Sequence, residues 1–316
     1  MKKIIISIAA CCVLALGAAA CGDDDDGSAN ANSGGGGGDL SGKIRIDGSS
    51  TVAPFVQAAA ENFEGENPDV KITVGTSGTG GGFEKFCAGE TDVSNASRPI
   101  KDDEEVPVCK KAGVDYKEVQ VANDGIAIVT NPDLKVDCLT VDQLKGLWNQ
   151  GSKVKSLSEI DPKLPDTELS LFGPGTDSGT FDFFTDVING EEGVSREDYQ
   201  PSEDDNVLVQ GVEGEPGGLG YFGHSYYEQN QDKLNLVKVD GGDGCVAPTV
   251  ETIQSGEYQP LSRALFMYPS TKALKRPEVK AFLQYINDNY KAIADASQIV
   301  AMSSDQAAKA KAALGG

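Results

Sequence analysis

The chain has 316 residues, a formal net charge of −22 and a single histidine. The acidic balance argues against nucleic acid as a partner, and any anionic ligand must be attracted by local donors rather than by the net field. One histidine also leaves little material for acid–base catalysis or for a zinc site.

The first forty or so residues are predicted to lie outside the fold. Lys2 and Lys3 precede an apolar run that ends in small residues, which is the pattern of a secretory signal over residues 1–20. The ending Ala18-Ala19-Ala20-Cys21 resembles a bacterial lipobox, which makes Cys21 the expected lipidated first residue of an exported lipoprotein. Ordinary cleavage near Ala20 and a retained anchor helix are the alternatives. Residues 21–42 are acidic and then Gly-rich, so we expect a flexible tether on the outer face of the cell membrane or in the periplasm.

The next part of the chain alternates strand and helix patterns. Apolar residues alternate in Lys43–Asp47 and in Val70–Val74, which predicts two strands. Pro54 opens a helix with apolar residues at helical spacing, and Phe83–Ala88 predicts a short helix that begins after a glycine turn. With a short strand at Val93–Ser97, the order β-α-β-α-β indicates a mostly parallel sheet with helices on its faces, the α/β class.

Two segments are predicted to cross between two lobes. Val119–Thr130 is apolar except at Asn123-Asp124-Gly125, and a polar, glycine-containing break in a strand suits such a crossing. Leu265–Tyr268 is an apolar segment that can cross back, so the two crossings are predicted at about 119–125 and 262–268. We expect lobe 1 at 43–121 plus 265–316, and lobe 2 at 122–264. Further predicted elements are a capped helix at 140–147, a strand at 169–172, a helix at 181–188, strands at 218–222 and 234–239, and a helix from 277 to about 297.

The cysteines fit an exported protein. Cys11 and Cys12 leave with the signal and Cys21 is used by lipid, so four remain. An even number predicts two disulfides, for which three pairings exist. We favour Cys87–Cys109, which are close in sequence, and Cys138–Cys245, which would lie together in lobe 2. Zinc is disfavoured because the mature chain has no Cys-x-x-Cys.

Four short stretches that combine glycine with hydroxyl residues lie between a predicted strand and the helix that follows it. They are Gly48–Thr51, Ser77–Gly82, Ser94–Pro99 and Gly175–Thr180. Helix starts leave backbone N–H groups unpaired and carry partial positive charge, and glycine lets the backbone approach a ligand. Several such loops in one chain predict a single oxyanion held from several sides.

The same stretches resemble a known family. Asp47-Gly-Ser-Ser-Thr-Val-Ala-Pro54, Gly75-Thr-Ser-Gly-Thr-Gly-Gly-Gly-Phe83, Asp92-Val-Ser-Asn-Ala-Ser-Arg-Pro-Ile100 and Gly173-Pro-Gly-Thr-Asp-Ser-Gly-Thr-Phe181 are similar to the phosphate-binding protein of Pst-type ABC importers. The resemblance runs from about Ile44 to about residue 295. It implies a periplasmic-binding-protein fold of the second type with a ligand cleft between the lobes. It also implies capture of inorganic phosphate for a membrane permease and an ATPase.

By this resemblance, three loops supply the hydrogen-bond donors. The implied residues are Ser50 and Thr51 in the first loop, Ser77 and Thr79 in the second, and Ser178, Gly179 and Thr180 at a helix start. Helix capping and ordinary turns are the structural alternatives for these positions.

The charged residues depart from the best-known members of this family. Those members carry an arginine just ahead of the Ser-Gly-Thr loop, where this chain has Pro174, and an aspartate at about the position of Arg98. We therefore expect Arg98 to supply the cation, since its planar fork suits two phosphate oxygens; a surface salt bridge is the alternative. The acceptor for the proton that phosphate retains is predicted to be Asp124 or Asp177. Asp124 can instead be a turn cap, and Asp177 a helix cap or a partner of Arg98.

One acceptor among many donors favours phosphate over sulfate, because sulfate has no proton and leaves the carboxylate unmatched. A binder of another oxyanion, such as sulfate, molybdate or phosphonate, is the nearest alternative. A phosphate-ester hydrolase using Ser178 is disfavoured because Gly175–Gly179 does not fit Gly-x-Ser-x-Gly and no P-loop motif occurs. We expect that the protein is not an enzyme and uses no cofactor or metal. We also expect a monomer that contacts the membrane only through its lipid anchor.

Overall fold

The computed structural model describes residues 40–176 and 178–315. The predicted signal, the lipidation site Cys21, most of the tether and Asp177 lie outside the described residues. In chain order, the first elements are β1 (Gly42–Gly48), α1 (Ala53–Glu66), β2 (Val70–Val74), α2 (Gly78–Cys87), β3 (Val93–Ala96), α3 (Glu105–Ala112) and β4 (Val119–Thr130).

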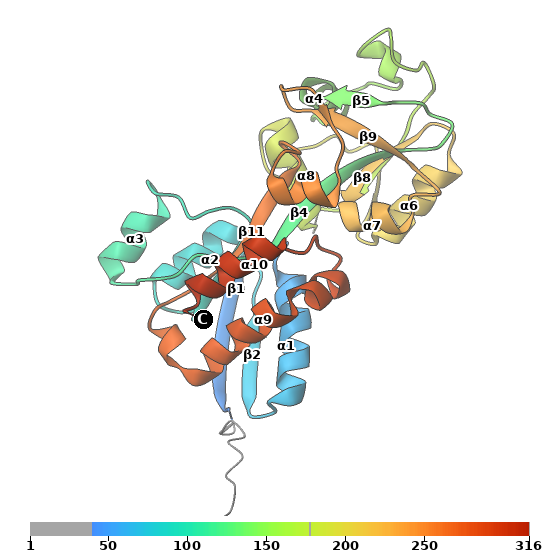
Figure 1. Ribbon diagram of the computed structural model, residues 1–316. Helices are drawn as coiled ribbons and strands as arrows, with labels where there is room; N and C mark the ends of the chain where they lie inside the picture. Colours follow the sequence, from blue (N-terminus) through green and yellow to red (C-terminus); the bar gives the residue numbers. More distant parts are fainter. Residues whose placement is uncertain (1–39, 177, 316) are drawn as a thin grey trace, which may run out of the picture. The chain divides into compact units, whose positions relative to one another are not determined.

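A second group follows β4. It comprises β5 (Cys138–Thr140), α4 (Val141–Trp148), η1 (Leu157–Glu159), β6 (Ser170–Pro174), α5 (Gly179–Phe184), η2 (Thr185–Asn189), β7 (Gln200–Ser202), α6 (Asp205–Gly214), β8 (Gly218–Gly223), α7 (His224–Gln229), β9 (Asn235–Asp240), β10 (Cys245–Val246) and α8 (Val250–Ser255). The chain then returns through β11 (Ser262–Pro269) to η3 (Ala273–Lys275), α9 (Pro277–Ala296) and α10 (Ser304–Ala313). These elements form two lobes (Figure 1).

The first lobe is a sheet with helices on both faces. β1 pairs in parallel with β2 and β3, and β11 pairs antiparallel with β3. Alternate residues of β11 divide between the faces, as strand geometry requires: Leu265 and Met267 pack with α1 and α9, whereas Phe266 and Tyr268 pack with α2 and α3. The sheet is therefore buried on both sides, which is typical of parallel α/β sheets.

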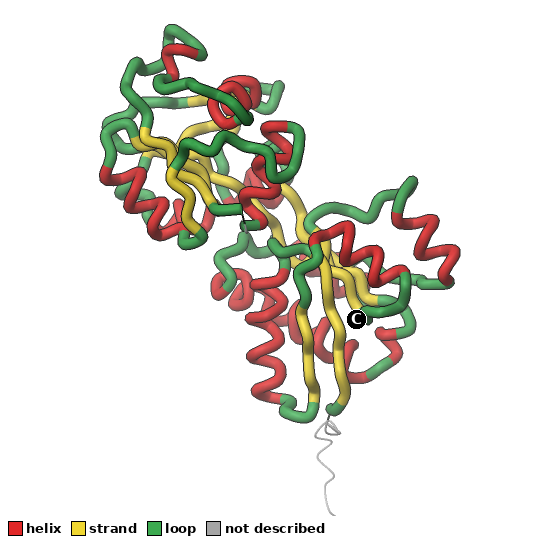
Figure 2. The backbone as a smooth tube through the Cα atoms, turned by 180° about the vertical axis from the view of Figure 1, so that it is seen from behind, coloured by secondary structure: helices red, strands yellow, loops and turns green. Residues whose placement is uncertain are grey.

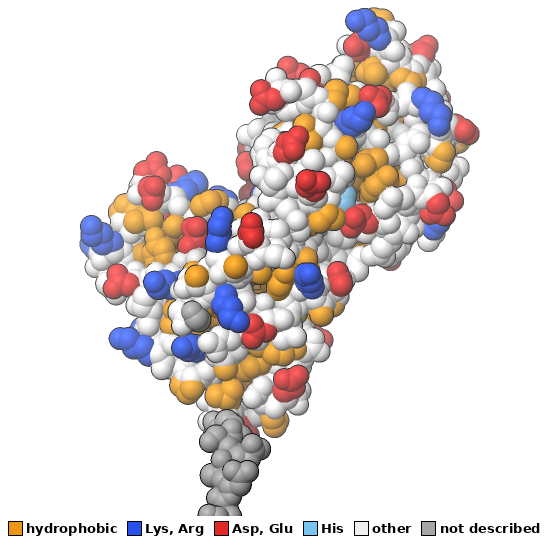
Figure 3. All heavy atoms as spheres, in the orientation of Figure 1, with side chains coloured by type: hydrophobic (Ala, Val, Ile, Leu, Met, Phe, Trp, Pro, Cys, Tyr) orange, Lys and Arg blue, Asp and Glu red, His pale blue; other side chains and the backbone are white. Residues whose placement is uncertain are grey.

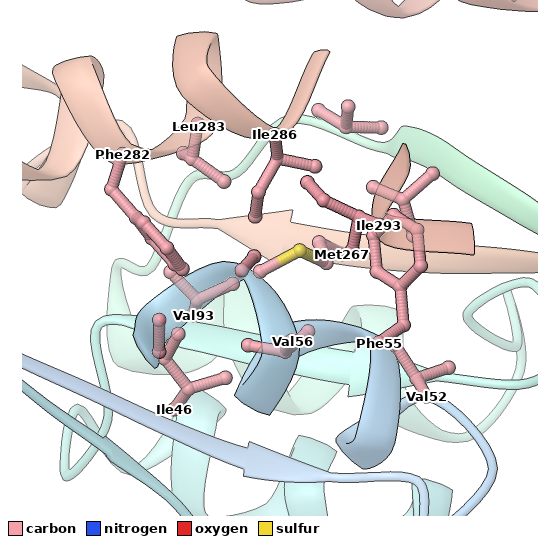
Figure 4. Packing of buried hydrophobic residues seen from close by; sticks show 14 of the residues in the cluster. Ile46, Val52, Phe55, Val56, Val93, Met267, Phe282, Leu283, Ile286 and Ile293 are labelled. Carbon is pink, nitrogen blue, oxygen red and sulfur yellow. The ribbon is translucent and has the colours of Figure 1, made fainter. Parts of the chain in front are cut away.

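The helices α1 and α9 owe their position to apolar residues at helical spacing. Each has a proline in its first turn, where the missing N–H carries no penalty. Figure 4 shows Ile286 of α9 above Val56 of α1, with Met267 between them, and Phe55 of α1 pointing toward Ile293 of α9. Burial of these side chains anchors both helices to the same face of the sheet.

The second lobe is built around the other half of β4. β8 and β9 pair antiparallel with it, and β6 pairs in parallel with β8 and β7. Ile126 and Ile128 face a core shared with α4, α5 and α8, whereas Ala127 and Val129 face α6. This sheet, too, is covered on both faces (Figure 2).

The strands β4 and β11 are common to both lobes and pair with each other antiparallel. Val119, Val121 and Ala122 belong to the core of the first lobe, and Ile126 belongs to that of the second. The α/β fold with two lobes joined by two crossing segments is thus confirmed.

Two local predictions were wrong. The helix expected at Phe83–Ala88 begins at Gly78 and takes in the glycines, because Gly82 lies against loop backbone: a Cβ there would come within 2.4 Å of the Gly48 Cα. The strand break expected at 123–125 is absent, since β4 runs unbroken through these residues, which pair with Ser262–Ala264 of β11. Polar residues are tolerated in this strand because they lie between the two cores.

The two favoured disulfides are confirmed. Cys87 and Cys109 join α2 to α3 in the first lobe, and Cys138 and Cys245 join β5 to β10 in the second. The capping box at Thr140 and the helix that begins at Pro277 are also confirmed. Within the described ranges, no helix combines the length and the apolar character needed to cross a membrane.

Candidate functional site

Loops from both lobes and the strand β11 line a pocket of about 630 Å³. Its wall includes Ser49–Thr51, Ser77–Gly80 and Ser97–Pro99 of the first lobe, Gly179, Asp182, Phe183, Asp186, Val187 and Glu192 of the second lobe, and Arg263, Ala264 and Phe266 of β11. The volume exceeds that of one tetrahedral anion, so a small ligand fills it only with water or with closure of the walls.

The first loop is held by the end of β3. Gly48 has φ of +139°, and a Cβ there would lie 2.1 Å from the Asn95 carbonyl oxygen, so only glycine fits. The Ser49 N–H donates to that same carbonyl oxygen at 3.0 Å. The turn presents Ser50 and Thr51 to the pocket, and the Thr51 hydroxyl accepts a hydrogen bond from Arg263 at 2.9 Å.

Asp47, near the end of β1, holds the second loop in place. Its carboxylate accepts the Ser77 N–H at 3.0 Å and the Ser77 hydroxyl at 2.9 Å, and it pairs with Lys85 at 2.5 Å. The hydroxyl proton of Ser77 is therefore already donated within the protein. Thr79 accepts the Ser97 N–H at 3.1 Å and shares a second hydrogen bond with the Ser97 hydroxyl.

Arg98 reaches the pocket wall but holds its fork on a neighbouring carboxylate. Its two terminal nitrogens lie 3.1 Å and 2.6 Å from the oxygens of Glu105, at the start of α3. This hydrogen-bonded pair raises the pKa of Arg98, and burial opposes it. The salt bridge that was the alternative for Arg98 is present, and Arg98 is also one of the residues that line the pocket.

Arg263 of β11 is a pocket cation that sequence reasoning missed. Its Nε donates to Asp124 at 3.1 Å, and its Nη2 donates to the Thr51 hydroxyl at 2.9 Å and to the Gly179 carbonyl at 3.3 Å. The guanidinium lies 3.8 Å from the ring centre of Phe183, and its side chain is 17% exposed. Burial lowers the pKa of Arg263, while Asp124 raises it. Among the described residues, no atom accepts a hydrogen bond from Nη1.

A signal for Arg263 was present in the sequence. The return crossing, expected at about 262–268, includes Arg263, but only its apolar residues 265–268 entered the prediction. A charged residue at the end of an otherwise apolar crossing strand marks the wall of a site, since a core strand does not keep an unpaired charge.

Asp124 supports Arg263 and is not part of the pocket wall. It lies opposite Arg263 in the β4–β11 register, and its carboxylate is mostly buried. The other expected acceptor, Asp177, lies outside the described residues. A carboxylate that was not expected, Asp182, lines the pocket in the first turn of α5. Burial and Glu192 raise the pKa of Asp182, and Arg263 opposes them.

The helix start at Ser178 meets the first loop directly. The Ser178 hydroxyl accepts the Thr180 N–H at 3.2 Å and keeps its own proton for another acceptor. Gly179 packs so closely that a Cβ would come within 2.3 Å of the Thr51 hydroxyl oxygen. This contact needs glycine, because any side chain would separate the two loops.

The structure thus brings most of the expected residues to one pocket. Ser50, Thr51, Ser77, Thr79, Arg98 and Gly179 line it, Ser178 and Thr180 flank Gly179, and Asp124 stands behind Arg263. Asp and Glu side chains are interspersed with Lys and Arg over the visible face rather than gathered (Figure 3). In the described part of the chain, His, Cys, Asp and Glu do not cluster in a way that could hold a metal ion.

Comparison with known proteins agrees with this architecture. The sequence profile of the PBP superfamily domain matches residues 32–289. The phosphate-binding protein PstS of Staphylococcus saprophyticus is 45% identical over 236 residues, covering 74% of this chain and 72% of that protein. Protein SphX of Synechococcus elongatus is 43% identical over 249 residues, covering 78% and 73% respectively.

A solved structure is also similar. The crystal structure of a possible phosphate binding protein from Planctomyces limnophilus has a TM-score of 0.83 and 47% sequence identity, covering 87% of this chain and 98% of that one. Fold and site therefore define a solute-binding protein rather than an enzyme. The chain belongs to the PstS family of phosphate-binding proteins, within the PBP superfamily.

Proposed function

We propose that this protein captures inorganic phosphate in a cleft between a lobe of residues 43–121 plus 265–316 and a lobe of residues 122–264. The observation that carries the proposal is Arg263, which contacts the Thr51 hydroxyl of one lobe and the Gly179 carbonyl of the other. A cation in this place can bind an anion only where both lobes contribute, and the names of the relatives point to phosphate as that anion.

The donors that we assign to phosphate come from three directions. The first lobe supplies the hydroxyls of Ser50, Thr51 and Thr79, the second supplies Ser178 with the N–H groups of Gly179 and Thr180, and the hinge supplies Arg263. Arg98 contributes from the rim, since Glu105 holds its fork. Ser77 acts through Asp47 and shapes its loop.

Selectivity requires an acceptor for the proton of phosphate. The Asp124 carboxylate already accepts from Arg263, whereas Asp182 lines the pocket and its carboxylate accepts no hydrogen bond from a described residue. We therefore assign the acceptor role to Asp182 and assign Asp124 to holding the guanidinium. Asp177, which lies outside the described residues, stays the alternative acceptor. Sulfate would meet Asp182 with lone pairs only and would be disfavoured.

We further propose that the chain is an exported lipoprotein, anchored through Cys21, that hands phosphate to the permease and ATPase of an ABC importer. The basic, apolar and small-residue order before Cys21 supports the anchor. A Cys21→Ala variant expressed in a lipoprotein-processing bacterium should appear in the soluble or secreted fraction, whereas the unaltered chain should partition with the membrane. Equal partition of both would contradict the anchor.

Titration calorimetry of the soluble mature chain tests the ligand. We expect one phosphate bound per chain and weaker binding of sulfate, molybdate and phosphonate. Sulfate binding as tight as phosphate binding would favour the general oxyanion binder. Turnover of a phosphate ester would favour the hydrolase, for which no described histidine lines the pocket.

A further inference from the structure

A third segment, between α9 and α10 of the first lobe, contacts both lobes beside β4. Val300, between α9 and α10, forms two backbone hydrogen bonds with Asn123 of β4, at 2.8 Å and 3.1 Å. The Val300 side chain packs into the core of the second lobe, whereas Met302, two residues later, packs into the core of the first. The chain between α9 and α10 therefore joins the two cores.

Amide side chains fix this segment to β4. Gln306 donates from Nε2 to the Asn123 Oδ1 at 3.1 Å and to the Gln254 carbonyl of α8 at 3.0 Å. Its Oε1 accepts from the Asn123 Nδ2 at 3.1 Å. Gln254 donates to the Ala301 carbonyl at 2.8 Å, and Gln120 donates to Asn123 at 2.9 Å. Asn123 is only 2% exposed, so the network is screened from water.

The segment touches the second lobe again at its start. Gln298 has φ of 55°, the only positive φ among the described non-glycine residues, and its side chain accepts a hydrogen bond from Gln229 of α7. Residues 298–301 and α7 also line a separate pocket of about 460 Å³. A positive φ at a non-glycine residue such as Gln298 persists only where the surrounding structure holds it.

The network includes Asn123, the neighbour of Asp124, whose carboxylate binds Arg263 of the proposed ligand site. Successive residues of a strand point to opposite faces, so Asn123 faces the amide network while Asp124 faces Arg263. Because the network holds Asn123, it also holds the β4 backbone at Asp124. The Asp124 carboxylate in turn orients the Arg263 guanidinium. No ligand atom needs to touch the network for it to influence binding.

We propose that Gln306 and Asn123 are positioning residues, and that the segment 298–306 is a third connection across the hinge which holds the Asp124–Arg263 pair toward the pocket. This inference rests on the proposed binding of phosphate by Arg263. It assigns a role in ligand affinity to the C-terminal helix α10, which lies far from the pocket wall in sequence.

The variant Gln306→Glu isolates the network. A carboxylate still accepts the Ser303 N–H at the start of α10, which Gln306 now accepts at 2.9 Å, but it cannot donate to Asn123 or to Gln254. Ser303→Ala is the matched control, because it removes the other half of the same capping box and leaves the network in place. Gln120→Leu, which removes one donor to Asn123, serves as a milder second variant.

We expect Gln306→Glu to weaken phosphate binding by about 3- to 30-fold in calorimetry and Ser303→Ala to leave it within about twofold. In an Asp124→Asn background, Gln306→Glu should add little, since both changes then act on the same guanidinium. Equal effects of Gln306→Glu and Ser303→Ala, additive effects with Asp124→Asn, or unchanged affinity in both Gln306→Glu and Gln120→Leu would each overturn the inference. Absence of phosphate binding by the unaltered chain would instead overturn the proposed function.

Discussion

The two arginines of the pocket lie in regions of opposite character. Arg98 follows β3 in the first lobe, and its fork is held by Glu105 of the same lobe. Arg263 lies on a strand shared by both lobes and contacts Thr51, Gly179 and Asp124. A cation confined to one lobe can only add local attraction, whereas one that touches both can couple ligand binding to their relative position.

The largest effect should come from Arg263→Ala. It removes the shared cation and leaves Asp124 buried without its partner, so we expect phosphate affinity to fall by about 100-fold or more in calorimetry. Arg263→Lys keeps the charge and loses the planar fork, and it should recover only part of the affinity. If Arg263→Ala binds phosphate as tightly as the unaltered chain, Arg263 is not part of the site and does not differ from Arg98 in this respect.

Gly179→Ala should have the next largest effect. The added Cβ would come within 2.3 Å of the Thr51 hydroxyl oxygen, so the loops of the two lobes must separate. We expect a loss of about 10- to 100-fold in phosphate affinity and a larger radius of gyration with phosphate in small-angle scattering. Gly214→Ala in α6 is the matched control, because no atom lies within 4 Å of its added Cβ and its φ is outside the left-handed region. Unchanged affinity in Gly179→Ala would show that the contact opens without consequence.

The Asp182→Asn variant tests the acceptor role that we assign to Asp182, through the pH dependence of stability and through anion selectivity. The pKa of Asp182 is raised from 3.8, so the folded protein binds more protons than the unfolded chain above pH 3.8 and loses stability as pH rises through the raised pKa. Asp182→Asn should therefore raise the melting temperature of the ligand-free protein at pH 7 and leave it unchanged below the pKa of 3.8. The ratio of phosphate to sulfate affinity should drop by about tenfold.

Asp186→Asn is the control for Asp182, because this carboxylate is exposed on the same wall. It should change the affinity for both anions in the same direction and leave their ratio intact. A constant ratio in Asp182→Asn would mean that another carboxylate, Asp124 or Asp177, takes the proton.

The fold was largely predictable because its signals are local. Alternation in β1 and β2, prolines at the starts of α1 and α9, and the Thr140 capping box each depend on a few neighbouring residues. The glycines of α2 were misjudged, since their reason lies elsewhere in the chain: Gly82 packs on the Gly48 backbone. A glycine required by a distant contact has the same appearance in sequence as one required by a turn.

The candidate site divides in the same way. The glycine and hydroxyl loops were found because each carries its own pattern, and residues from all four line one pocket. Arg263 was missed because its function depends on β4 and β11 lying side by side, with residues 124 and 263 in register. Its partners are 212, 139 and 84 residues away in sequence, and no local pattern records such contacts.

Arg98→Ala should have the smallest effect of the series and sharpen the comparison most. Its ion pair with Glu105 is partly exposed, at 33% and 12% for the two side chains, and such pairs contribute little to stability. We expect phosphate affinity to fall by about two- to fivefold, with a melting temperature close to that of the unaltered chain.

Glu105→Gln is the companion variant, because it removes the charge that holds the Arg98 guanidinium. If Arg98 can reach the anion, phosphate affinity should rise in Glu105→Gln. In the double variant the affinity should return to that of Arg98→Ala. A loss in Arg98→Ala as large as in Arg263→Ala would mean that phosphate draws Arg98 away from Glu105. The anion would then be held by two cations, one from the first lobe and one from the hinge.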